Sequence, residues 1–177
     1  MIANKTYNNV INTIKNIGNQ HLQIATVTTG DIFDINLDKM EKFALMHINP
    51  VNVTTGEFGL TYNFQIFICD LVSEKADWTE ANIQSANNLS NEQEVLSETL
   101  QISVDIISML RHSEHQSTEN VDDINKGLYF AEGQQTLEPF TERFDNLLTG
   151  WVFSLGVLVA NDFDACTIPA TSKAAGE

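Results

Sequence analysis

Hydrophobic and polar positions alternate with a helical period at the start of the chain. Apolar residues recur every three or four positions between residues 7 and 17, while Asn and Lys fill the other side. Gly18 follows directly and suits the end of this helix, because glycine readily adopts the left-handed conformation that follows a last helical turn. The pattern predicts an amphipathic helix whose apolar stripe requires a partner surface.

A longer helix is predicted over residues 94 to 110. Its apolar residues follow one line and widen into a broad stripe, which is typical of a helix packed flat on a sheet. Arg111 and His112 suit the negative end of a helix dipole, so we expect the helix to end there. A polar surface loop is expected to follow over residues 113 to 126.

The strongest strand signal precedes this helix. From Phe58 to Ile68, bulky and small or polar residues alternate without a break, which is the period of a half-buried strand. The sequence TTGE at 54–57 suits a hairpin turn back to the preceding run FALMHINPVNV. Pro50 in that run cannot donate to a strand ladder, so it marks a bulge, a bend or an edge.

A second hairpin is predicted near the end of the chain. Glu and Phe alternate at every second position from Glu138 to Phe144, which favours a strand, although Phe140 and Phe144 are also four apart, as on a helix. Residues 145 to 150 are expected to form the turn into the next strand. These expectations place both aromatic residues beside the long apolar run that follows.

The apolar run from residue 147 to 160 is the least polar part of the chain. It is shorter than the roughly 20 residues that a helix needs to cross a bilayer, and its bulky residues alternate, so we expect a strand and no membrane contact. The bulky face, from residue 151 to 159, is expected on the core. The smaller face, which holds Ser154 and Gly156, could be approached closely by a helix or by a neighbouring copy.

Together these elements predict an α+β domain: a twisted, mostly antiparallel sheet with an N-terminal helix and one long helix packed on it. A further short strand is expected around residues 22 to 27. We expect one domain over residues 1–169, because 177 residues suit a single core. Residues 170–177 lack apolar anchors and are expected to form a flexible tail.

The net charge of the chain limits the kinds of partner that it can bind. It carries 24 acidic and nine basic residues, a formal net charge of −15. Nucleic-acid binding needs clustered Lys and Arg to displace counterions, so this composition argues against a nucleic-acid grip and against a polybasic membrane surface. The acidic surface instead keeps copies of the chain apart in water.

Candidate metal ligands occur in two places. The sequence RHSEH brings His112, Glu114 and His115 together, but three local donors without a fourth are better explained by a solvated helix end. Asp162 and Asp164 follow the last strand, and a turn explains them better than a calcium loop, which needs more oxygen ligands. We therefore expect no metal site.

The remaining reactive side chains point to no catalytic site. His47 lies inside an apolar strand and is expected to be a hydrogen-bonded core or sheet-edge residue. Cys69 lies where both strand faces are apolar, so we expect that end of the strand to be covered on both sides. Cys69 and Cys166 are expected to be free thiols. No phosphate-binding loop or nucleophile motif is present, and we expect neither enzymatic activity nor a cofactor.

Four segments of the chain carry a resemblance to a known group of proteins. They are FALMHINP at 43–50, FQIFICDLV at 64–72, EVLSETLQISVDIISML at 94–110 and LEPFTERFDNLLTGWVFSLGVLVANDFDACTIP at 137–169. Together they resemble bacteriophage neck, or head-to-tail connector, proteins with the tail-terminator type of ring fold. The closing segment is the most characteristic. All four are patterns of structural residues, and they bring no catalytic residue with them.

The resemblance implies a structural virion protein. Its copies would form a homo-oligomeric ring, with the portal or an adaptor above it and tail proteins below it. The ring would join head to tail around a channel through which DNA passes without specific binding, and an acidic lining suits such passage. The protein would be assembled in the host cytoplasm and located in the neck or tail of the virion.

A ring subunit needs a surface for its neighbour, because heterologous contacts between identical copies close the ring. We expect the smaller face of the last strand to be covered in the assembly. The residues expected at the subunit interface are Trp151, Phe153, Ser154, Gly156, Phe140 and Phe144. The alternative is a small soluble acidic module that binds a ligand or peptide in a pocket between the long helix and the sheet.

Overall fold

The computed structural model describes residues 7–31, 42–56, 59–72, 91–119, 128–130, 134–143 and 147–160. Two helices and six strands lie in these ranges. In chain order they are α1 (Tyr7–Gln20), β1 (Thr26–Thr29), β2 (Leu45–Thr55), β3 (Gly59–Leu71), α2 (Glu92–Glu119), β4 (Leu128–Phe130), β5 (Leu137–Arg143) and β6 (Leu147–Ala160).

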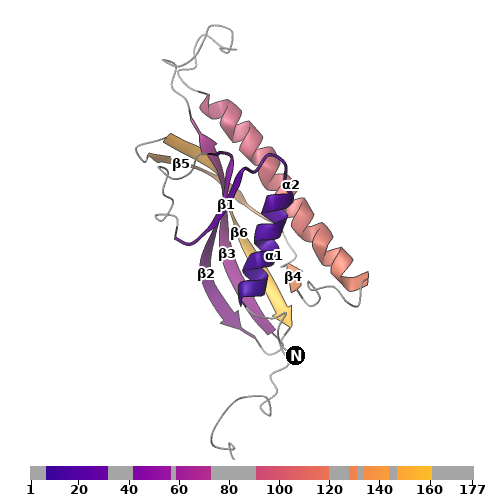
Figure 1. Ribbon diagram of the computed structural model, residues 1–177. Helices are drawn as coiled ribbons and strands as arrows, with labels where there is room; N and C mark the ends of the chain where they lie inside the picture. The colour runs from indigo at the N-terminus through magenta and orange to yellow at the C-terminus, as the bar shows by residue number, and fades with distance from the viewer. Residues whose placement is uncertain are drawn as a thin grey trace, which may run out of the picture.

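The strands form one sheet in the order β1-β2-β3-β6-β4, and β5 also pairs with β6. Only the β1–β2 pair is parallel, and the other pairs are antiparallel. Both helices lie on the same face of the twisted sheet (Figure 1). The predicted α+β fold, with an N-terminal helix and one long helix on a mostly antiparallel sheet, is confirmed.

Helix α1 buries the stripe that its spacing predicts. Val10, Ile11, Ile14 and Ile17 are all buried in the core between the helices and the sheet. Gly18 was expected to end the helix, but α1 continues to Gln20, so that expectation is wrong. A Cβ at Gly18 would lie 2.6 Å from the sulfur of Met46 and 3.0 Å from a methyl of Val27. The glycine therefore lets the helix approach β1 and β2 closely.

The first predicted hairpin is present as β2 and β3. Their register runs from the Leu45–Cys69 pair to the Thr55–Leu60 pair, and the amide of Gly56 donates to the carbonyl of Gly59 at 2.8 Å. The register shifts between Pro50 and Asn52, so the bulge predicted at the proline is confirmed.

The opposite end of β3 is covered on both faces, as predicted. Phe67, Ile68 and Cys69 are all buried, although they alternate between the two faces of the sheet. Cys69 is a free thiol. Burial raises the pKa of the Cys69 thiol to about 12, with a smaller contribution from the neighbouring Asp70, so the thiol is kept protonated and unreactive.

Helix α2 extends further than its apolar pattern indicates. The predicted end near Arg111 and His112 is wrong, and residues 113–119, which we expected to form a loop, continue the helix to Glu119. The apolar stripe of the sequence ends at Leu110, which is the last residue of α2 in the described core. The polar residues beyond contain neither Gly nor Pro, so nothing in them interrupts the backbone hydrogen bonds.

Strand β6 is the longest strand, and β3 pairs with it along nearly its whole length. Its other edge is shared by β4, which pairs with residues 157–159, and by β5, which pairs with residues 147–153. The expected turn over residues 145–150 was too long, because β6 already begins at Leu147. Strand β4 was not predicted, and β1 lies at Thr26–Thr29, after the start of the expected range 22–27.

Candidate functional site: the open face of the sheet

One face of the sheet is covered by the two helices, and the other is not. The helix-covered face contributes Phe64, Ile66, Phe153, Leu155 and Val157 to the core, which also includes side chains of both helices. No helix of the described ranges lies on the opposite face, which we call the open face (Figure 1). The prediction that the bulky side of the last strand faces the core is therefore confirmed for its central residues.

The middle of the open face carries polar side chains. Gln65 of β3 lies opposite Ser154 of β6, and Asn63 lies opposite Gly156. The side-chain amide of Asn63 donates to the Oδ1 of Asn52 at 2.7 Å, so adjacent strands are joined by side chains as well as by their backbones. Ser154 and Gln65 are exposed, and Asn63 and Gly156 are half-buried. Exposed amide and hydroxyl groups of this kind can also form hydrogen bonds with a partner protein.

The open face lacks charge along its three central strands. Residues 45–56 of β2, 59–69 of β3 and 147–160 of β6 contain no Asp, Glu, Lys or Arg. The remaining charged residue of these strands, Asp70, pairs with Thr149 and lies on the helix-covered side. In a chain with a net charge of −15, three adjacent strands without an acid on this face form a distinct region, which Glu138 of β5 borders where it pairs with Val152.

Aromatic side chains close one end of the open face. The rings of Phe67 in β3 and Phe140 in β5 meet edge to face, with centroids 5.4 Å apart. His47 lies next to Phe67, at a centroid distance of 6.2 Å. This contact spans β2, β3 and β5, because β5 places Phe140 opposite Gly150 at the far edge of β6. Burial is greatest at this end, and the polar region begins beyond it.

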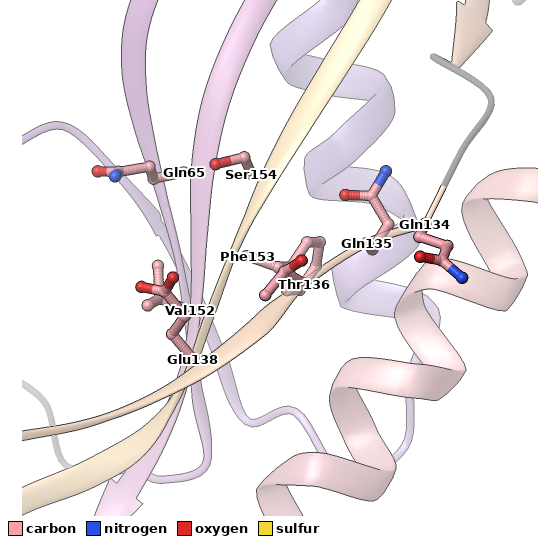
Figure 2. A pocket seen from close by; sticks show the side chains of 8 residues that line it. All are labelled: Gln65, Gln134, Gln135, Thr136, Glu138, Val152, Phe153 and Ser154. Carbon is pink, nitrogen blue, oxygen red and sulfur yellow. The ribbon is translucent and has the colours of Figure 1, made fainter.

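A small cavity lies where β4 and β5 leave part of β6 unpaired. Residues 154–156 of β6 have no strand partner on that edge within the described ranges. The cavity has a volume of about 280 Å³. It is lined by Gln65, Gln134, Gln135, Thr136, Glu138, Val152, Phe153 and Ser154, and Figure 2 shows the amides on both sides of the space. It does not lie between the long helix and the sheet, where the alternative function would place a pocket.

The structure separates the residues that we expected at a subunit interface. Ser154 and Gly156 lie together on the open face, and Phe140 lies on the same face at the aromatic end. Trp151 lies on the helix-covered side, where its indole Nε1 donates to the carbonyl of Leu96 in α2 at 2.8 Å. These placements leave two of the six residues on the accessible polar part of the open face.

The other two expected interface residues are not available in the same way. Phe153 is 2% exposed and belongs to the core of the single subunit. Phe144 lies outside the described residues. Sequence reasoning did not select Asn52, Asn63 or Gln65, although the alternation along residues 58–68 already places the last two opposite the core. That alternation was the signal that could have identified them.

The other candidate residues support no chemistry in the described ranges. His47 is 1% exposed, and its ring contacts the hydroxyl of Thr28 at 2.8 Å and the carbonyl of Gly30 at 3.1 Å, as expected for a hydrogen-bonded core histidine. Within the described residues, no three His, Cys, Asp or Glu side chains are grouped to hold a metal. The side chains of RHSEH at 111–115 beyond the arginine, and residues 161–177 with Asp162, Asp164 and Cys166, lie outside what the structure describes.

Comparisons with known proteins do not assign the chain to a family. No protein-family model matches the chain, and no curated protein matches it either. Neither helix of the described ranges is long and apolar enough to cross a membrane.

Proposed function

We propose that this chain is the repeating subunit of a homo-oligomeric ring in the neck or tail of a bacteriophage, where it joins the portal and head to the tail around the DNA channel. The observation that carries the proposal is the open face, whose three central strands present an uncharged and partly polar surface in a strongly acidic chain. The resemblance of four segments to neck and tail-terminator proteins supplies the identity of the assembly.

Charge favours a second copy as the partner of the open face. Two copies that each carry a net charge of −15 repel one another wherever their acidic surfaces meet. A surface without acids can approach another copy without this repulsion. Interfaces between proteins are depleted in charged residues at their centres, and the open face has that composition. A basic partner, by contrast, would find no acidic side chain on the open face of these central strands, and only Glu138 of β5 at their border.

The same charge suits a ring that surrounds DNA. Binding of DNA depends on the number of phosphates that Lys and Arg neutralise, and nine basic residues against 24 acids provide few. A ring of such subunits would let DNA slide through without holding it. No catalytic step and no cofactor is needed for this role.

The alternative ligand-binding function has less support. The cavity beside Ser154 measures about 280 Å³, below the roughly 300–1,000 Å³ of small-molecule pockets. Its lining is mostly amide and hydroxyl groups rather than the apolar walls that bury a ligand. A polar notch of this size is better suited to receive a side chain from a neighbouring protein surface.

A matched pair of serine substitutions tests the proposal. Ser154→Asp adds a negative charge to the open face, whereas Ser108→Asp adds the same charge to the exposed surface of α2. We expect the unmodified protein to form rings in negative-stain electron micrographs and in light scattering after gel filtration. We expect Ser154→Asp to raise the concentration needed for assembly at least tenfold and Ser108→Asp to leave it nearly unchanged.

The proposal has a clear point of failure. If the protein stays monomeric at high concentration and images of its native particle show no ring, the proposed function is wrong. Genes for a portal, a capsid protein and a terminase beside its own gene would be an independent observation in its favour.

A further inference from the structure

The outer edge of β2 is paired for only part of its length. Strand β1 pairs with residues 45–48 of β2, and no described strand pairs with the outer edge of residues 49–55. Figure 1 shows this half of β2 running free along the border of the sheet. An unpaired strand edge presents a row of backbone N–H and C=O groups that can accept another strand.

Specific contacts end β1 at this point. Gly30 follows the last residue of β1 and has a φ of 140°, a conformation that other residues rarely adopt. Its amide donates to the carbonyl of Ile48 at 3.1 Å, and its carbonyl accepts from the Nε2 of His47 at 3.1 Å. The chain is thereby held at the middle of β2, where β1 ends, and the second half of β2 has no strand partner on this edge among the described residues.

The direction of the backbone groups on this edge follows from the ladder. The carbonyl of Ile48 faces β1, so the groups of the next residue, Asn49, face β3. Past the bulge, Asn52 and Thr54 take the positions that face β3, opposite Asn63 and Thr61. The backbone groups of Val53 therefore point outward, away from the sheet.

The edge has little of the protection that natural edge strands usually carry. Charged side chains, above all Lys, commonly block such edges, but residues 45–56 contain no charged residue. Val51 is 52% exposed and Val53 is 48% exposed. Pro50 and the bulge do interrupt the edge, although only at its start. Beyond the bulge the edge combines outward backbone groups with exposed β-branched side chains, which favours strand pairing.

The same chain offers a matching edge on the far side of the sheet. Through β3 and β6, Val53 is level with Phe130 of β4, and Thr55 is level with Leu128. Strand β2 is antiparallel to β3, β3 to β6, and β6 to β4, so β4 runs antiparallel to β2. Two copies placed side by side in the same orientation therefore bring β4 of one against β2 of the other, level and antiparallel.

We propose that the open half of the β2 edge pairs antiparallel with β4 of the next copy, so that the sheets of neighbouring subunits join edge to edge. This inference rests on the proposed ring, because only a head-to-tail arrangement uses two different edges of identical copies. The partner is a second copy of this chain, since the edge is uncharged and its complement, level and antiparallel, lies on the same fold.

A proline at Val53 tests the edge directly. Val53→Pro removes an outward amide and leaves the bonds between β2 and β3 in place, because proline lacks an N–H and Val53 does not use its own for that ladder. The control, Val53→Ala, keeps the amide and removes most of the side chain. We expect Val53→Pro to abolish rings or raise the assembly concentration at least tenfold, and Val53→Ala to change it less than threefold.

The outcomes separate the two proposals. Rings that persist in a folded Val53→Pro variant would overturn the edge pairing while the ring function stands. A wild-type protein that never forms rings would overturn both. A variant that assembles poorly yet has the circular dichroism spectrum and melting temperature of the wild type would support the edge pairing.

If the Val53→Pro variant does not fold, disulfide cross-linking tests the pairing of β2 with β4 of the next copy instead. Thr54 is level with Tyr129 through Thr61 and Leu158, so cysteines at the two positions would face each other across the predicted contact. In a Cys166→Ser background, oxidation of the Thr54→Cys, Tyr129→Cys double variant should give a ladder of covalent oligomers. Each single variant should give none, and a double variant without a ladder would overturn the pairing.

Discussion

Replacing Thr28 by Val should loosen the contact that holds the short strand β1 against β2. The Thr28 hydroxyl contacts the Nδ1 of His47 at 2.8 Å, and the Nε2 of the same ring contacts the carbonyl of Gly30 at 3.1 Å. A carbonyl only accepts, so Nε2 carries a proton, and in the neutral ring Nδ1 accepts from the threonine hydroxyl. Valine has nearly the shape of threonine but cannot donate, so the substitution removes this bond alone.

The size of the effect follows from the burial of the ring. His47 is 1% exposed, so water cannot take the place of the lost hydroxyl. Leaving a buried polar atom without its partner costs about 1–3 kcal/mol of the free energy of unfolding. For a domain of this size each kcal/mol lowers the melting temperature by about 2–4 °C. We therefore expect Thr28→Val to lower the melting temperature by about 2–12 °C.

Thermal and urea unfolding, followed by circular dichroism, measure this loss. The control is Thr29→Val, one residue further along β1, where the side chain makes no hydrogen bond within the described residues. We expect the control to change the free energy of unfolding by less than about 0.5 kcal/mol, as for substitutions away from such contacts. Equal effects of the two substitutions would show that the histidine contact is not what holds β1 in place.

Two further substitutions probe the sheet and its charge. Gly150→Ala should cost about 3 kcal/mol or more in urea unfolding, because its Cβ would contact the backbone carbonyl of Ile68, whereas Gly56→Ala, with 3.5 Å of space, should cost little. Burial, with a smaller contribution from Glu98, raises the pKa of the Asp70 carboxyl above 3.8, although a backbone hydrogen bond opposes the rise. Its charge at neutral pH therefore destabilises the fold, and this cost disappears as the pH falls through the raised pKa toward 3.8. Asp70→Asn should accordingly be more stable than the wild type at pH 7, and the difference should vanish near pH 3.5; a difference that does not change with pH would contradict this reasoning.

Much of the sheet could be predicted because a strand that is buried on one face has apolar residues at every second position of its sequence. The runs in β3 and β6 alternate cleanly, and their core faces are those expected from residues 58–68 and 151–159. Pro50 likewise has a local signature, since a missing N–H limits where a strand can hold it. These features depend only on residues close together in the chain, so they can be recognised from the sequence alone.

Features that depend on distant contacts were missed or misplaced. Helix α2 continues past Leu110, where the apolar stripe ends, because helix propagation needs no apolar residue. Strand β4 is only three residues long and has no period to detect. Its place beside β6 is set by pairing across the sheet. Trp151 was expected at the subunit interface, but its indole N–H is used within the subunit, where it donates to the carbonyl of Leu96 in α2.

The location of charge on the fold links the candidate site to the edge of β2. Acidic side chains such as Glu94, Glu98 and Asp105 are carried by α2 on the helix side, whereas β2 and β6 carry none and β3 carries only Asp70, which also lies on the helix side. In a monomer this separation has no evident use, because a solvated sheet face is more soluble with charges on it. Between copies of one acidic chain it has a use. It leaves the central strands, with their open face and the free edge beyond Ile48, as the surface where a second copy meets the least repulsion, with Glu138 of β5 at its border.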